Sequence, residues 1–182
     1  MAPQVFFFLA TGFEEVEALL PIDILRRCGV DARLISIGSS LQVAGAHGVR
    51  VLCNGLLSAT DFSQASAMVL PGGMPGAKYL AESEPLGVLL KESAEKGIGL
   101  CAICAAPMVL GRHGLLNGKR ATCYPGFESY LQGATTCSDL VVCDGNVITG
   151  KGPGAAAEFG FAIAKSLCPS ELVDEVRAQM FF

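Results

Sequence analysis

The sequence predicts an α/β protein with a doubly wound, mostly parallel sheet and one or two antiparallel additions. Short apolar runs alternate with longer segments of helical periodicity, which is typical of βαβ units. Glycine-rich turns follow several of the apolar runs, and two stretches carry hairpin signals. With 182 residues, 51% hydrophobic and 16% charged, the chain can bury one core, so we expect a single domain over residues 1–182.

The alternation runs from one end of the chain to the other. The expected strands are 4–10, 32–38, 67–73, 98–103 and 141–149. Helical patterns follow four of them, at 14–29, 85–97, 105–114 and 152–167. Residues 41–55, where Val49, Val51 and Cys53 alternate between glycines, predict an antiparallel excursion. An Asp-Gly turn within 141–149 predicts a hairpin. In such sheets ligands bind where strands end and helices begin.

Charge and hydropathy exclude two classes of partner. The net charge is −4 and no basic cluster is denser than Arg26-Arg27, so we expect no nucleic-acid partner. The opening residues lack a basic n-region, and the longest uncharged run, 97–111, is too short to span a bilayer. We therefore expect a soluble, cytoplasmic protein without a membrane partner.

The eight cysteines could form a disulfide framework, but their share is low for such scaffolds and the apolar content can build a core. We expect most to be reduced, small, buried hydrophobes. Cys101 and Cys104 admit three kinds of chemistry. A zinc site needs a further Cys/His set, which two histidines do not provide, so we expect no metal and no cofactor. A redox pair needs access to solvent, yet Cys101 lies inside an apolar strand.

The third chemistry is a nucleophile elbow at Cys104. The strand 98–103 ends just before Cys104, and Ala105 to Pro107 begin a helix, where proline is tolerated. A thiol there faces the positive end of a helix dipole, which predicts a lowered pKa. The alternative interpretation is that Cys104 is an unreactive cysteine buried in the core.

Two further sets of residues are candidates for the site. Glu17 shares an apolar helical stripe with Leu20 and Ile24. Two interpretations of Glu17 are therefore open: a buried carboxyl whose pKa is raised, or an acid on the protein surface. Gly72 and Gly73 follow a strand and could present backbone amides to an anion, although a simple turn explains them as well. The segment Gly152-Pro153 likewise has a turn as its simpler interpretation, and a wall of the site as the second.

Residues 13–27, 69–80, 102–128 and 149–163 together resemble the ThiJ/PfpI superfamily, in particular its small, single-domain, DJ-one-like branch. The resemblance implies a flavodoxin-like three-layer sandwich, a homodimer and a reactive cysteine at Cys104. It also implies that protonated Glu17 donates a hydrogen bond to the thiolate. Gly72, Gly73 and Ala105 would supply backbone amides around it.

One position departs from that branch. The branch carries a histidine before a proline downstream of the cysteine, and Tyr124 stands there in this chain. Proton transfer would then fall to Glu17, with Tyr124 as a second candidate donor. His113, late on the elbow helix, is expected to be structural or a charge at the helix C-terminus. Ala105 follows the nucleophile where protease relatives carry His or Gly, which argues against peptidase activity.

Two functions use the same site. The first is a cofactor-independent glyoxalase or deglycase, in which the Cys104 thiolate attacks a small reactive carbonyl such as methylglyoxal, glyoxal or an early glycation adduct. The second is a redox-sensing, stress-protective or chaperone-like protein that uses oxidation of Cys104.

Overall fold

A computed structural model describes residues 2–182. The strands are β1 Gln4–Leu9, β2 Asp31–Ser36, β3 Gln42–Ala44, β4 Arg50–Leu52, β5 Gly55–Leu56, β6 Ala65–Leu70, β7 Gly99–Ile103, β8 Arg120–Ala121, β9 Thr135–Thr136, β10 Val141–Asp144 and β11 Val147–Gly150. The α-helices are α1 Glu15–Arg27, α2 Gly76–Glu82, α3 Glu84–Glu95, α4 Pro107–Arg112, α5 Ala156–Leu167 and α6 Ser170–Gln179. Three short 3₁₀ helices are η1 Leu57–Ala59, η2 Glu128–Tyr130 and η3 Pro153–Ala155.

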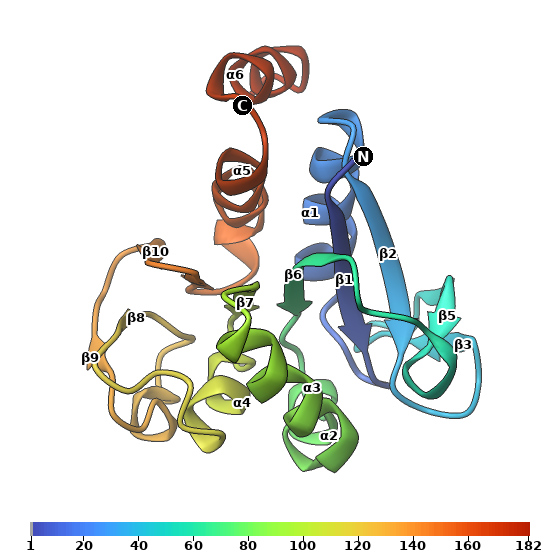
Figure 1. Ribbon diagram of the computed structural model, residues 1–182, viewed down its shortest axis with the longest axis vertical. Helices are drawn as coiled ribbons and strands as arrows, with labels where there is room; N and C mark the ends of the chain where they lie inside the picture. Colours follow the sequence, from blue (N-terminus) through green and yellow to red (C-terminus); the bar gives the residue numbers. More distant parts are fainter. Residues whose placement is uncertain (1) are drawn as a thin grey trace.

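Seven strands form one central sheet in the order β10-β11-β7-β6-β1-β2-β5, and helices flank it (Figure 1). Every neighbouring pair in this sheet is parallel except β10 with β11. Helix α1 packs against α5, while α2 contacts α3 and α4 (Figure 1). The doubly wound α/β fold is therefore confirmed.

Both predicted antiparallel additions are present. β3 and β4 pair around Val43 opposite Val51. β10 and β11 form the second hairpin, but Asp144 is the last strand residue, paired with Val147, and Gly145 begins the connecting loop with φ +61°. Strands β5, β8 and β9 were not predicted, because two residues are too few to show an alternating pattern.

The connectivity decides where a site can form. From β1 the chain adds β2 on one side, and it later places β6 on the other side of β1 and β7 beyond it. Such a reversal is a topological switch point, where open α/β sheets bind ligands at the carboxyl ends of their strands. The segments that follow β1, β6 and β7 therefore meet at one edge of the sheet.

The core explains why these strands lie in the centre. Residues 5–9 of β1 have no exposed surface at all, as expected for a strand covered on both faces of a parallel sheet. Helices α1 and α5 approach closely at Gly160, where a Cβ would lie 2.9 Å from Cδ1 of Ile24. Between residues 2 and 182, no helix is long and apolar enough to cross a membrane.

Candidate active site

Cys104 lies at the sharp turn between β7 and α4. The strand ends at Ile103, Cys104 has φ +65°, and the helix begins at Pro107. The left-handed region is unfavourable for a residue with a side chain, so the surrounding structure must hold Cys104 there. Its N–H donates to the carbonyl oxygen of Gly150 at 2.9 Å, which ties the turn to β11. The predicted strand, cysteine and helix arrangement is confirmed.

Glu17 reaches the same point from α1. Its side chain is completely buried, which supports the apolar-stripe interpretation and not a surface acid. Oε2 accepts a hydrogen bond from the Gly72 N–H at 2.8 Å, while Oε1 has no hydrogen-bond partner among the described residues. A Cβ on Gly72 would lie 2.6 Å from Cβ of Cys104 and 2.7 Å from Oε2 of Glu17. Only glycine fits between the thiol and the carboxyl.

Burial controls the ionisation of both groups. It raises the pKa of Glu17 to about 7, although the neighbouring Cys104 thiol and the Gly72 N–H favour the carboxylate. Burial also raises the pKa of the Cys104 thiol to about 12, and the negative charge of Glu17 adds to that increase. The expected lowering of the thiol pKa is therefore wrong. The backbone amides of Gly73 and Ala105 do lower it, but less than burial raises it, and α4 is only six residues long.

With a Glu17 pKa of about 7 and a higher pKa for Cys104, both groups are protonated below about pH 7, and the pair holds one proton above it. Once one proton has left the pair, the remaining one can sit on sulfur beside a carboxylate or on Glu17 beside a thiolate. In the second arrangement the carboxyl is neutral and no longer repels the thiolate. Moving the thiol proton to Glu17 is thus the route to a nucleophile in this site.

The backbone amides of the site interact with two different groups, the Cys104 thiol and the Glu17 carboxyl. Those of Gly73 and Ala105 favour the thiolate of Cys104. The Gly72 amide instead donates to Glu17, which corrects the expectation that all three surround the sulfur. Gly73 has φ +84°, a conformation that glycine adopts without strain and that turns the chain away after β6.

Tyr124 and the Gly152-Pro153 segment also meet near the elbow. The Tyr124 N–H donates to the carbonyl oxygen of Cys104 at 2.9 Å, and its half-exposed ring packs over Gly152. Tyr124, Gly152 and Pro153 line a cavity of about 220 Å³ together with Lys151 and other residues. The wall predicted from Gly152 and Pro153 thus lies next to Tyr124.

The other cysteines do not join this site as a redox or metal set. All eight, each within the described residues, are unpaired thiols. Cys101 is 1% exposed inside β7, and burial raises its pKa, which disfavours a redox pair with Cys104. Cys53 belongs to the hydrophobic core, whereas Cys143 is exposed and does not fit the buried description.

His113 is a structural residue. It follows α4 and packs against Gly87, where a Cβ would lie 2.6 Å from Nε2 of the imidazole. Burial lowers its pKa, and the positive charges of Lys91 and Arg112 lower it further. The expected alternative, a cation at the helix C-terminus, is therefore disfavoured.

A parallel sheet that presents a cysteine on a strained strand-to-helix turn, beside a buried carboxyl, defines an α/β protein with a nucleophile elbow. Comparison with family models then identifies the family. Residues 3–166 match the model of the DJ-1/PfpI family, and the chain belongs to it.

Individual relatives agree with this assignment. Protein dj-1beta of Drosophila melanogaster is 36% identical over 97% of this chain and 95% of its own length. The glutathione-independent glyoxalase DJR-1.2 of Caenorhabditis elegans is 36% identical over 85% of this chain and 82% of its own. Protein DJ-1 homolog B of Arabidopsis thaliana is 39% identical over 90% of this chain, which spans only 37% of that relative. The solved structure of oxidised Toxoplasma gondii DJ-1 superposes with a TM-score of 0.95 at 33% identity, covering 100% of this chain and 99% of that one.

One cluster of chemically active side chains was not predicted from the sequence. Glu14, Glu15 and His47 come together beside the start of α1, although 32 residues separate Glu15 from His47. Spacing along the chain carries no signal for such a cluster. Only the docking of the β3–β4 turn onto the loop before α1 creates it.

Proposed function

We propose that the chain is a glyoxalase of the DJ-1 type, which converts methylglyoxal to lactate and glyoxal to glycolate without a cofactor. The observation that carries the proposal is the pairing of Cys104 with a fully buried Glu17 across Gly72. The name of the Caenorhabditis relative, a glutathione-independent glyoxalase, supports it. Early glycation adducts carry a similarly reactive carbon and form the second substrate class of the proposal.

The reaction balances with the groups of the site. Transfer of the Cys104 proton to Glu17 generates the thiolate, whose sulfur attacks the aldehyde carbon, and Glu17 returns the proton to the new alkoxide. The Glu17 carboxylate then moves a proton from that carbon to the neighbouring carbonyl carbon, while the hydroxyl proton passes to the oxygen of that carbonyl. The hemithioacetal thereby becomes a thioester of lactate through an enediol. Water hydrolyses the thioester and regenerates the thiol. The backbone amides of Gly73 and Ala105 stabilise negative charge near the sulfur.

We propose that Tyr124 contacts the substrate and is a second proton donor. Its ring is half-exposed over the Gly152-Pro153 wall, where it can contact substrate and donate its phenolic proton. It occupies the position of the histidine that the family resemblance implies. Glu17 is the group that lies beside the sulfur, so we assign the proton transfers to it.

The test is lactate formation from methylglyoxal in D₂O without glutathione. We expect the wild-type chain to form lactate that carries deuterium at C2, because a proton moved by Glu17 exchanges with solvent. Deuterium at C2 would distinguish this proton shuttle from an internal hydride shift. Lactate formation no faster than in buffer would refute the glyoxalase proposal as a whole.

Oxidation of Cys104 is the second candidate function, and the likeness to an oxidised Toxoplasma DJ-1 favours it. A sulfinate at Cys104 would accept hydrogen bonds from the Gly73 and Ala105 amides and from protonated Glu17. After mild peroxide treatment, mass spectrometry should find two added oxygens on the Cys104 peptide and none on the exposed Cys143. Oxidation spread evenly over the cysteines would contradict a sensor role.

We also propose that the chain forms one domain that assembles as a homodimer. The proposal rests on the family resemblance. Large apolar side chains left exposed on the chain, among them Val16, Val49 and Leu52, offer surface that a second copy could cover. A sedimentation mass equal to one chain would contradict it.

A further inference from the structure

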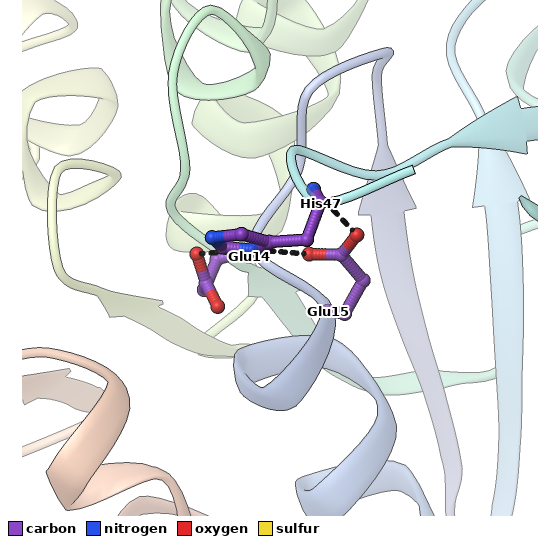
Figure 2. A group of neighbouring side chains, drawn as sticks. All are labelled: Glu14, Glu15 and His47. Carbon is purple, nitrogen blue, oxygen red and sulfur yellow. Dashed lines mark hydrogen bonds and ion pairs between the residues drawn. The ribbon is translucent and has the colours of Figure 1, made fainter. Parts of the chain in front are cut away.

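Glu14, Glu15 and His47 form a cluster that the proposed reaction does not use. Glu14 precedes α1, Glu15 begins it, and His47 lies in the turn between β3 and β4 (Figure 2). One ring nitrogen of His47 and one carboxylate oxygen from each glutamate all lie within 4.8 Å of one another. No protein cation other than His47 is paired with either carboxylate in residues 2–182.

Backbone contacts hold the two loops together independently of these side chains. The Ala46 N–H donates to the Phe13 carbonyl oxygen at 2.8 Å, and the Gly12 N–H donates to the Ala44 carbonyl oxygen at 2.8 Å. Gly45 lies against the Glu15 carboxyl so closely that a Cβ there would overlap it. These backbone hydrogen bonds thus help to hold the imidazole beside the carboxylates.

The Glu15 carboxylate is oriented for one further ligand. Its Oε1 accepts hydrogen bonds from the backbone N–H groups of His47 at 2.8 Å and Val49 at 3.3 Å. Oε2 faces Nδ1 of His47 at 2.9 Å, and Oε2 of Glu14 lies 3.7 Å from the same nitrogen. Hydrogen bonds that fix one oxygen of a carboxylate and aim the other are the usual outer shell of a metal ligand.

The ligand separations suit a small divalent ion. Zinc-to-ligand bonds of about 2.0–2.2 Å in tetrahedral geometry place neighbouring ligand atoms about 3.3–3.6 Å apart. The observed separations of 2.9 Å and 3.7 Å therefore need only small side-chain movements. In the single chain the His47 side chain is 71% exposed, which leaves an open path for the ion and for water ligands. One imidazole with two carboxylates favours zinc and its first-row neighbours over calcium or magnesium, which prefer oxygen alone.

We infer that Glu14, Glu15 and His47 bind one divalent transition-metal ion of the zinc type, with water completing its coordination. The ion would replace the proton that now joins Nδ1 of His47 to Glu15. This site is separate from the Cys104 thiol, and it does not depend on the glyoxalase proposal.

The experiment is a Co²⁺ titration of the full chain in a Cys104→Ser background, followed through visible absorption and through the imidazole signals in NMR spectra. The chain has only two histidines, so each ring signal can be assigned. We expect one Co²⁺ per chain, loss of the His47 ring signals by paramagnetic broadening, unchanged His113 signals and displacement of cobalt by Zn²⁺.

Matched variants decide the outcome. His47→Ala and Glu14→Gln should weaken Co²⁺ binding at least about tenfold, whereas Glu171→Gln, on the distant α6, should leave it unchanged. Because His47 is exposed, its variant should keep the wild-type fold by circular dichroism. Absence of saturable binding, equal binding by His47→Ala, or a thiolate-to-cobalt charge-transfer band would each overturn the inference. Since Cys104 is absent from the assay, loss of glyoxalase activity has no bearing on the result.

Discussion

Replacement of Cys104 by serine should lower lactate formation from methylglyoxal by about a thousandfold or more, because the nucleophile carries the covalent step. A serine hydroxyl at the same turn is a far weaker nucleophile, and Glu17 is not basic enough to ionise it. The measurement is kcat/KM for chirally resolved lactate.

The fold should survive this change. Serine keeps the Cβ and needs the same left-handed backbone that Cys104 adopts at φ +65°. Cys143→Ser, at an exposed thiol, is the matched control and should retain wild-type turnover. Undiminished lactate formation by Cys104→Ser would assign the chemistry to another residue and refute the role proposed for the elbow.

Replacement of Glu17 by glutamine should lower the same turnover by about 10²- to 10⁴-fold, the usual contribution of a general acid–base group. The amide can still accept the hydrogen bond from the Gly72 N–H, so the site keeps its shape. It cannot take the thiol proton or move a proton between the substrate carbons. Turnover equal to that of the wild type would exclude Glu17 as the proton carrier.

The same variant should change how stability depends on pH. The folded wild type holds the Glu17 proton up to a pKa of about 7, against 4.5 for the unfolded chain, so it binds more protons than the unfolded chain within that window. Its free energy of unfolding should therefore fall as pH rises from 4.5 to 7, by up to roughly 3 kcal/mol at about 1.4 kcal/mol per pKa unit.

Glu17→Gln has no such proton to lose. Relative to the wild type it should gain stability across the window from 4.5 to 7 and gain no more above it. Urea unfolding of both proteins at several pH values between these limits measures the difference. Parallel stability curves for the two proteins would show that Glu17 ionises as it does in the unfolded chain.

Much of the fold could be predicted because its signals are local. The alternation of apolar runs and helical patterns identified the parallel strands, and the Asp-Gly sequence identified the β10–β11 hairpin. Strands β8 and β9 escaped because their pairing comes from distant contacts, with Arg120 opposite Thr135. Two residues cannot show a period.

The sequence by itself determined the fold class and the strand-to-helix turn at Cys104, since both depend on residues close along the chain. It placed Glu17 on an apolar helical stripe but left a surface acid open, and the structure showed that the side chain is buried. Only the tertiary structure decided that Gly72 separates the thiol from the carboxyl and that the thiol pKa is raised. It also brought His47 to Glu14 and Glu15. The physical reason is that ionisation and ligand geometry depend on burial and on charges from segments far apart in sequence, whereas periodicity reports only which face of an element is apolar.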